Sequence, residues 1–322
     1  MYGINNIPQY SIKKVIREKK LCVEISENLG NQMFMYAHAY ALSKKLGRKL
    51  YIDNESAFLK KNSIGLYRLD NFNISAKIIK KKFKFLSIIQ YVRKKYLLKL
   101  DYFKNNKIFY EEKRDKNKKT YFYEDPNLKK NNNSLIYVKG HFESEKYFRN
   151  YKNLICKEYI FKKDKQYLNN VYFKYILKNN VVAISIRQNR YNERNFNQTK
   201  NILLKKKSDI FLKQQINYIK NAIYYFKSKI KNPKFLIWSN DFSNLDKYFD
   251  NNFMFVKNSN KKKDLVDLYL LTKCKYFIVA PSTFSWWGAW LSKRKGKICV
   301  RPKNLNVSNN KDFWPENWKP IL

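Results

Sequence analysis

Histidine and cysteine are scarce in this chain of 322 residues, and both shortages argue against whole classes of function. His38 and His141 are the only histidines, which speaks against a histidine-built metal site and against a Ser-His-Asp triad. The 4 cysteines lie far apart and show neither metal-ligand spacing nor a disulfide framework. We therefore expect no bound metal, and free thiols in a reducing cytoplasm.

Long apolar runs and nucleotide-binding signatures are also missing. No run approaches the ~18 apolar residues of a transmembrane helix, and residues 1–20 have no apolar signal-peptide core. We expect a cytoplasmic protein that is at most peripheral at the inner membrane face. Neither GxGxxG nor GxxxxGKS/T occurs, so dinucleotide-binding and P-loop NTPase functions lose their main support.

Acidic residues are outnumbered, since 68 Lys and Arg stand against 25 Asp and Glu and the formal net charge is +43. Such a charge favours nucleic acid or an anionic surface as a partner. However, arginine is rare and the lysines are spread along the whole chain, whereas a nucleic-acid site usually gathers arginine on one face. We therefore favour a solvated surface and expect no nucleic acid partner. The charge stays compatible with attraction to an anionic membrane.

Apolar periodicity predicts strands that alternate with helices, which is typical of parallel α/β sheets. Strand-like runs lie at residues 21–26, 49–52, 135–140, 181–186, 235–238, 253–256, 276–279 and 297–300. Helical runs lie at residues 33–47 (stopped by Gly47), 143–163, 208–229 (capped by Ser208) and 263–272. We place the domains at residues 1–165 and 166–322. Residues 76–135 are Lys-rich and predict a helical insertion that leaves the sheet.

Polar turns follow three predicted strands of the second half, at Arg187, Ser239 to Asp241 and Ser282 to Ser285. In a doubly wound sheet these carboxyl ends meet at the edge where ligands bind. The stretch from Asp264 to Leu291 joins a strand, a hydroxyl-rich turn and an aromatic helix start, and such a helix start can hold a phosphate. The alternative is an ordinary buried helix cap. The simplest interpretation of Gly30, after the first strand, is a turn with positive φ.

Several motifs, in consistent order over about residues 21–301, resemble the bacterial α-1,2-fucosyltransferase family, glycosyltransferase family 11. The last of these motifs, STFSWWGAWL, is a specific string of ten residues at the end of the stretch from Asp264 to Leu291. The segments that carry the resemblance are GNQMFMYA from Gly30, YRLDNFNI from Tyr67, SIRQNRY from Ser185, SND from Ser239, DLYLLTKC from Asp267 and STFSWWGAWL from Ser282.

The resemblance implies a GT-B architecture, in which two Rossmann-like domains face each other across a cleft. It implies an inverting, metal-independent transfer of L-fucose from GDP-fucose to the 2-hydroxyl of a galactoside. The second domain would hold the donor and the first would shape the acceptor side. The acceptor would be a galactose-containing glycan or a lipid-linked oligosaccharide of the cell surface.

The resemblance also implies roles for single positions. Arg187 matches an arginine that contacts the donor diphosphate and would stabilise the leaving charge. Asn31 matches an asparagine expected near the reacting centre, and Asp267 an aspartate that accepts hydrogen bonds from guanine. Further donor contacts are implied for Ser185, Asp241, Ser282, Thr283 and Ser285. By residue type alone, two alternatives stay open. Arg187 could form a structural ion pair, and Asp267 could be a solvated helix residue.

Some positions depart from the family pattern, namely Ser185 for His, Gln188 for the second Arg, Asn189 for Gly, Arg190 for Asp and Asn240 for Asp. Arg190 could return the charge lost at Gln188. Two alternatives therefore stay open: a donor-binding homologue without catalysis, and a fucosyltransferase of another linkage or acceptor. No general base of the family is matched, and Glu27 and Glu193 are the candidate carboxylates. We interpret the tryptophans of STFSWWGAWL mainly as packing, with sugar stacking as the alternative.

Overall fold

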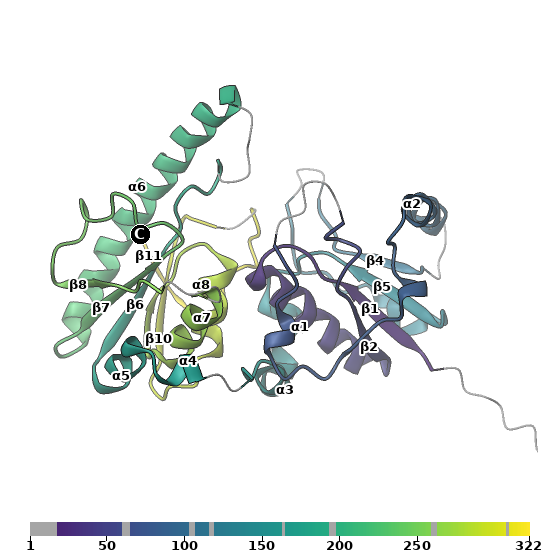
Figure 1. The fold of residues 1–322 in the computed structure, drawn as a ribbon, viewed down its shortest axis with the longest axis horizontal. Helices are drawn as coiled ribbons and strands as arrows, with labels where there is room; N and C mark the ends of the chain where they lie inside the picture. The colour runs from purple at the N-terminus through teal and green to yellow at the C-terminus, as the bar shows by residue number, and fades with distance from the viewer. Residues whose placement is uncertain are drawn as a thin grey trace, which may run out of the picture.

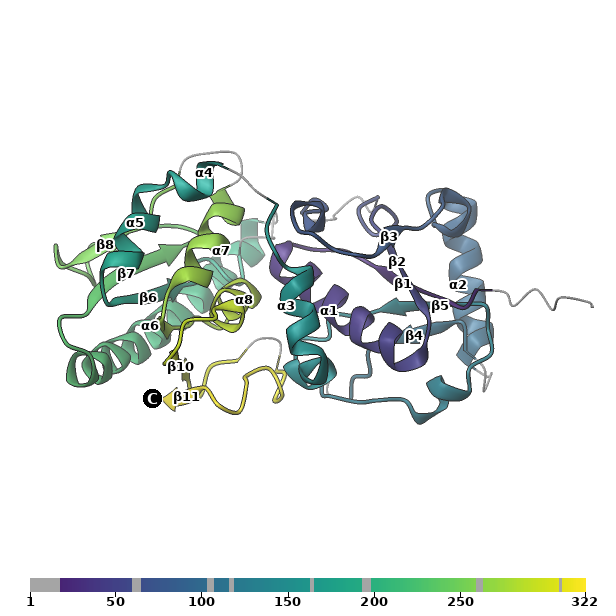
Figure 2. The ribbon, with the colours of Figure 1, turned by 90° about the horizontal axis from the view of Figure 1, so that it is seen from below.

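The computed structural model describes residues 18–59, 65–102, 107–115, 119–162, 165–192, 198–258, 263–306 and 309–322. In this part of the chain two parallel sheets lie side by side, each with helices packed around it (Figure 1). The chain passes from the first half to the second between α3 (Lys152–Glu158) and α4 (Lys165–Leu168) (Figure 2). The expected α/β class with two parallel sheets is confirmed.

The first sheet has the strand order β3-β2-β1-β5-β4, with every neighbouring pair parallel. Its strands are β1 (Lys20–Glu24), β2 (Lys49–Asp53), β3 (Lys77–Ile78), β4 (Phe109–Glu111) and β5 (Leu135–Lys139). The middle of the central β1, Leu21 to Val23, is apolar and fully buried, as expected for a parallel strand that is covered on both faces. Residues 76–135 contain β3 and β4, so the segment expected only to leave the sheet supplies both of its edges.

The second sheet has the strand order β11-β10-β9-β6-β7-β8 and is also parallel. Its strands are β6 (Val181–Ile186), β7 (Lys234–Ser239), β8 (Phe253–Phe255), β9 (Tyr276–Ile278), β10 (Ile298–Pro302) and β11 (Lys319–Ile321). The chain runs outward from β6 to β8 and then returns to the other side of β6 with β9. This is the Rossmann order, whose ligand crevice forms where the direction reverses, at the carboxyl ends of β6 and β9.

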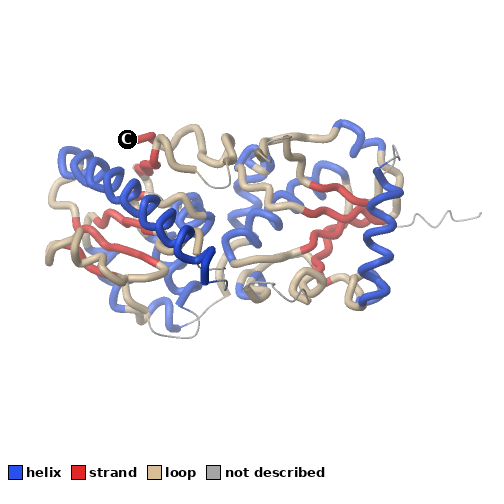
Figure 3. The backbone as a smooth tube through the Cα atoms, turned by 90° about the horizontal axis from the view of Figure 1, so that it is seen from above, coloured by secondary structure: helices blue, strands red, loops and turns tan. Residues whose placement is uncertain are grey.

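The helices pack on both sheets, and α6 crosses the second sheet while α2 lies at the far end of the first (Figure 3). Besides α3 and α4, they are α1 (Leu29–Leu46), α2 (Ile88–Tyr102), α5 (Val171–Lys178), α6 (Gln198–Lys229), α7 (Lys263–Lys273) and α8 (Thr283–Leu291). Gly47 ends α1 in the left-handed conformation with φ 60°, as the sequence predicts. No helix among these residues is both long and apolar enough to cross a membrane.

Three predicted helix bounds are wrong. Helix α1 begins at Leu29, four residues before the predicted start at Met33, and so includes Gly30. Ser208 is not a cap, because α6 already begins at Gln198; the buried Ser208 hydroxyl instead donates to Asn192 Oδ1 at 2.7 Å. The helix predicted at 143–163 is broken into two short 3-10 turns followed by α3. The break falls at Phe148, whose φ of −144° is not helical and whose buried ring stacks on Trp287 at 5.6 Å. Tertiary packing thus overrides the local helical pattern.

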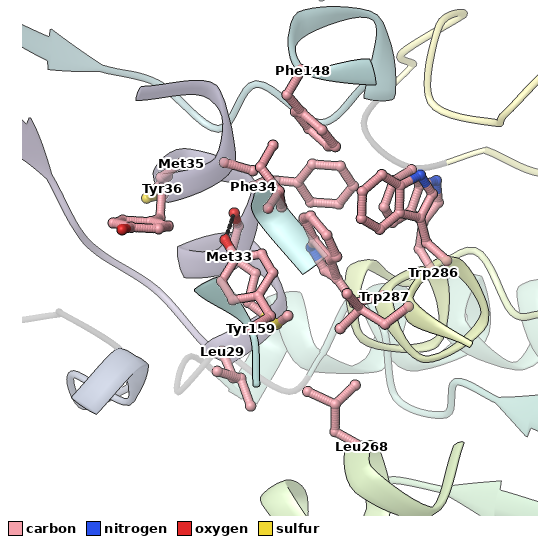
Figure 4. Packing of buried hydrophobic residues seen from close by; sticks show 14 of the residues in the cluster. Leu29, Met33, Phe34, Met35, Tyr36, Phe148, Tyr159, Leu268, Trp286 and Trp287 are labelled. Atoms are coloured by element: carbon pink, nitrogen blue, oxygen red, sulfur yellow. Dashed lines mark hydrogen bonds between the residues drawn. The ribbon is translucent and has the colours of Figure 1, made fainter. Parts of the chain in front are cut away.

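The two halves share one buried apolar core, centred where α1 packs against α8 (Figure 4). The ring of Phe34 lies 4.6 Å from Trp286 and 4.9 Å from Trp287. The indole N–H groups of Trp286, Trp287 and Trp290 donate to Phe313 O, Gly30 O and Glu145 Oε2. All three indoles are buried, which favours packing over sugar stacking.

Candidate active site

A cavity of about 680 Å³ opens between the two halves, and residues at the carboxyl ends of β6 and β9 line one of its walls. It therefore lies at the reversal point of the second sheet, where a Rossmann fold binds its ligand. Residues near the start of α1 and after β5 line the side that belongs to the first half. The cavity brings together these residues predicted from the sequence: Asn31, Ser185, Arg187, Asp267, Ser282, Thr283 and Ser285.

Arg187 follows β6 directly and lines the cavity from a fixed backbone. Its N–H donates to Gln215 Oε1 at 3.1 Å, and Gln215 Nε2 donates back to its carbonyl oxygen at 2.8 Å. Gln215 is fully buried in α6, so its side chain anchors the backbone of Arg187 to the protein interior. The guanidinium group is a planar, preorganised fork, so it loses little entropy for each hydrogen bond that it donates to an anion.

Two residues that depart from the family pattern, Gln188 and Asn240, form hydrogen bonds with each other. Gln188 N donates to Asn240 Oδ1 at 2.9 Å, and Asn240 Nδ2 donates to Gln188 O at 3.2 Å. An aspartate at 240 could accept the first bond but could not donate the second. Asn189, where the family has Gly, adopts φ 54°, a left-handed conformation that Asn tolerates well.

The side chains of Gln188 and Arg190 lie in different surroundings, and only Arg190 lines the cavity. The amide of Gln188 donates to the carbonyl oxygens of Asp241 and Ser243, at 2.6 and 3.1 Å, and the residue is not part of the cavity lining. Arg190 does line the cavity. Arg190 thus brings a positive charge to the cavity, two residues after Gln188, which replaces the second arginine of the family pattern.

Asp241 is the one predicted site residue that does not line the cavity. Its carboxylate accepts from the backbone N–H of Ser243 at 2.9 Å and from Asn189 Nδ2 at 2.8 Å. The hydrogen bonds from Ser243 hold the pKa of Asp241 below its ordinary value. Asp241 therefore stabilises the turn, while its neighbours Ser239 and Asn240 face the cavity.

Asp267 lines the cavity from α7 and is not a solvated helix residue. Burial raises its pKa to about 6, although a hydrogen bond of 2.6 Å from Asn258 Nδ2 to its Oδ1 opposes this shift. The same bond fixes the orientation of the carboxyl group. A half-buried, oriented carboxylate is suited to accept hydrogen bonds from a planar ligand edge.

The start of α8 combines the two roles that its sequence left open. Ser282 is the N-cap, and its Oγ accepts from Phe284 N at 3.3 Å. The buried Ser285 hydroxyl donates to Ala280 O at 2.9 Å, which holds the turn after β9. These residues and Thr283 also line the cavity, so the positive end of the helix dipole faces it.

The GNQ motif at the start of α1 joins the first half to this helix. Gly30 does not adopt a positive φ, contrary to the sequence interpretation; it is needed because a Cβ there would lie 2.6 Å from Thr283 Oγ1. Asn31 Oδ1 accepts from that same hydroxyl at 2.8 Å. Gln32 is buried, and its Nε2 donates to the carbonyl oxygens of Glu27 and Leu66, both at 2.7 Å.

Glu143 is a cavity residue that the sequence patterns did not single out. It follows β5, is 5% exposed, and its side chain takes part in no hydrogen bond or ion pair within the described residues. Burial, helped by the charge of Glu112, raises its pKa to about 7. Arg190 acts in the opposite direction. A carboxyl group with a pKa near neutrality, in a cleft, is poised for proton transfer.

The two carboxylates considered as bases from the sequence have different outcomes. Glu27 lines the cavity, in a left-handed conformation with φ 66°. Glu193 lies outside the described residues. Within those residues no group of three or more His, Cys, Asp or Glu is placed to hold a metal ion.

Comparison with known proteins identifies the family. The model of glycosyl transferase family 11 matches residues 4–321. The chain is 30% identical over 304 residues to the O-antigen biosynthesis glycosyltransferase WbnK of Escherichia coli, with 89% of this chain and 95% of WbnK covered. It is 26% identical over 312 residues to an alpha-1,2-colitosyltransferase of Escherichia coli, with 92% of this chain and 97% of that protein covered.

Two solved structures share the fold. A crystal structure of NodZ alpha-1,6-fucosyltransferase soaked with GDP-fucose has a TM-score of 0.50 at 15% identity, covering 91% of this chain and 97% of that one. A mutant of FUT1 from Arabidopsis thaliana in complex with GDP has a TM-score of 0.51 at 13% identity, covering 89% and 71%. At these identities the likeness concerns the fold, and it confirms the expected GT-B arrangement. With a family match over almost its full length, the chain belongs to glycosyl transferase family 11.

Proposed function

We propose that this chain transfers L-fucose from GDP-fucose to the 2-hydroxyl of a galactoside, forming an α-1,2 bond with inversion. One observation carries the proposal: Arg187, Asp267 and the start of α8 line a single cavity together with Asn31 of the first half. Membership of family 11 supplies the reaction class. Fold relatives solved with GDP-fucose and with GDP support a GDP-linked donor.

Asp267 is proposed to select the base of the donor. Guanine presents an N–H and an amino group side by side, whereas adenine offers no such pair of donors to one carboxylate. The hydrogen bond from Asn258 turns the carboxyl group of Asp267 and leaves it within the cavity wall. We therefore expect GDP-sugars to bind and ADP-sugars to bind poorly.

Arg187 and the positive end of α8 are proposed to hold the diphosphate. As the bond between C1 of fucose and the β-phosphate oxygen breaks, negative charge builds on GDP. A bidentate guanidinium and a helix N-terminus stabilise that charge most when it is fully developed. Arg190 lines the same cavity and adds a second positive charge, so we expect turnover to persist in EDTA.

Glu143 is proposed as the general base. The acceptor 2-hydroxyl attacks C1 from the face opposite GDP, the C1–O bond breaks, and the hydroxyl proton moves to the Glu143 carboxylate. Glu143 belongs to the first half, on the side that would shape the acceptor site, and its pKa of about 7 suits this proton transfer. Glu27 lines the same cavity and is the competing candidate.

The acceptor is proposed to be a galactose-containing glycan, free or lipid-linked, of the cell surface, because WbnK is named for O-antigen biosynthesis. A second candidate activity is the transfer of colitose in the same linkage. It is favoured by the relative named alpha-1,2-colitosyltransferase, which aligns over almost the full chain.

The test is incubation of purified protein with GDP-fucose and a β-galactoside, beside the matched 2-deoxygalactoside. We expect GDP release and an NMR correlation between fucose H1 and galactose C2 with the first acceptor only. Fucosylation at another hydroxyl would contradict the linkage, and GDP binding without product would point to a homologue without catalysis. GDP-colitose in place of GDP-fucose separates the second candidate from the first.

A further inference from the structure

Helix α2 carries a row of apolar side chains that faces solvent. Its start is well defined by a capping box, in which Gln90 N donates to Ser87 Oγ at 3.2 Å and Ser87 N donates to Gln90 Oε1 at 3.1 Å. Side chains four apart lie on one helix face. We call the following residues, with their exposed fractions, the outer face of α2: Ile88 (84%), Ile89 (81%), Val92 (58%), Tyr96 (62%) and Leu100 (39%).

The opposite face of α2 already packs on the first half. Lys94, on that inner face, is buried and forms an ion pair with the buried Glu24 of β1. The same ammonium group lies 4.8 Å from the ring centroid of Phe85. The outer face is therefore an apolar surface that the attachment of the helix does not use. All three whole-molecule views place α2 at the end of the first half that lies away from the second sheet (Figures 1, 2 and 3).

The surroundings of the outer face are strongly basic. Residues 76–100 include no Asp or Glu. The exposed cations of this segment are Lys77, Lys80, Lys81, Lys82, Arg93, Lys95 and Lys99. Arg93, Lys95 and Lys99 belong to α2 itself and border or interrupt its apolar row. An apolar stripe flanked by Lys and Arg is the pattern of a helix that lies in a membrane interface.

We propose that the outer face of α2 docks on an anionic phospholipid bilayer, with its apolar side chains among the acyl chains and its cations at the headgroups. Charge complementarity favours this occupant, since each Lys or Arg near an anionic leaflet adds attraction. A second copy of the chain is disfavoured, because a symmetric contact through α2 would bring two sets of these cations together. Docking here would hold the enzyme at the surface where lipid-linked acceptors reside.

The experiment is flotation of the full chain with vesicles of phosphatidylcholine alone, or of phosphatidylcholine and phosphatidylglycerol in equal parts. The variants are Ile88→Ser/Val92→Ser and Lys95→Glu/Lys99→Glu. The control is Ile202→Ser/Leu203→Ser on α6, because these two residues are similarly exposed, at 73% and 72%. All changed side chains are solvent-exposed, so the melting temperature and the GDP affinity should stay as in wild type; both are measured.

The wild type and the α6 variant should float with the anionic vesicles and much less with the neutral ones, with binding that weakens as salt is raised. Both α2 variants should lose at least about tenfold in apparent vesicle affinity. The first loses the burial of two apolar side chains among the acyl chains, and the second loses two cation contacts with the headgroups. The proposal is overturned if the wild type ignores anionic vesicles, if the α2 variants bind as well as wild type, or if the α6 variant loses as much. A dimer that depends on Ile88 and Val92, seen by light scattering without vesicles, would also overturn it.

Discussion

The hydroxyl of Thr283 donates a hydrogen bond of 2.8 Å to the side-chain oxygen of Asn31, and so joins the first turns of α8 and α1, where both residues line the cavity. Gly30, the residue before Asn31, accepts a second hydrogen bond through its backbone oxygen, from the indole N–H of Trp287 at 3.0 Å. The two most specific motifs of the chain therefore contact each other. Together they set the distance between the two halves at the site where donor and acceptor would meet.

The Gly30→Ala variant should lose both stability and donor affinity. A Cβ would lie 2.6 Å from Thr283 Oγ1 and 2.8 Å from the Phe284 backbone nitrogen, so α1 and α8 must separate. Overpacking of this kind costs about 1–3 kcal/mol, measurable by urea denaturation. The control is Gly47→Ala, where nothing lies within 4 Å but φ is +60°. It should lose stability only, and equal loss of GDP binding in both variants would refute the contact.

The Asp267→Asn variant should bind GDP about 10- to 100-fold more weakly, because hydrogen bonds to a charged acceptor contribute about 1.5–3 kcal/mol. At the same time it should be more stable than wild type at pH 8, because it no longer buries a carboxylate whose pKa is raised to about 6. Weaker binding together with higher stability cannot come from misfolding. Calorimetry with GDP and ADP checks the first effect, and a preference for ADP over GDP in wild type would contradict the assignment.

GDP affinity should also depend on pH through Asp267. The carboxylate form accepts the guanine hydrogen bonds, and its pKa in the free protein is about 6. Affinity should therefore fall as the pH is lowered from 7.5 to 5, and the fall should be much smaller in Asp267→Asn. If GDP affinity falls equally with pH in wild type and Asp267→Asn, the pH dependence belongs to another group.

The Glu143→Gln variant should keep its GDP affinity and lose turnover about 10²- to 10⁴-fold, as expected for removal of a general base. In wild type, kcat/KM should rise with pH through about 7, because the base acts when deprotonated. The charged groups that influence this pKa are Glu112 and Glu27, which raise it, and Arg190 and Arg114, which lower it. Glu27→Gln is the matched control, and a larger loss of turnover there would make Glu27 the base.

The stability of the protein should also report the buried Glu143. Its folded pKa of about 7 exceeds the ordinary 4.5, so the folded state keeps a proton that the unfolded chain releases between these values. The contribution of Glu143 to the free energy of unfolding is therefore fully present below pH 4.5. It is lost as the pH rises towards 7, by about 1.4 kcal/mol per pKa unit. Glu143→Gln should raise the melting temperature more at pH 8 than at pH 5. An equal change at both pH values would mean that Glu143 is not buried as described.

Local patterns predicted the parts of the fold and the site that depend on short stretches of chain. The strand, turn and helix start around Ser282 could be predicted because each piece has its own residue pattern. Arg187 could be predicted because it directly follows a buried strand in which Ser185 is the single polar residue. Asn189 shows the limit of motif matching. Its departure from Gly is a change that the left-handed turn accepts, with φ 54°.

Long-range contacts explain what could not be predicted. Glu143 gains its raised pKa from burial and from Glu112, which lies on a separate segment of the chain. Gly30 is required by Thr283, which is more than 250 residues away in the sequence, and not by its own turn. The short edge strand β3 exists because β2 pairs with it, since two residues carry no pattern of their own.

The most direct test of the account is a calorimetric titration of GDP into wild type, Arg187→Ala and the control Arg93→Ala, an exposed arginine of α2. If the cavity between the two halves is the donor site, the wild type and the control bind one GDP with equal affinity. Arg187→Ala then binds it about 10- to 100-fold more weakly, as for the loss of charge-assisted hydrogen bonds to the diphosphate. Unchanged GDP affinity in Arg187→Ala would contradict the donor site proposed here.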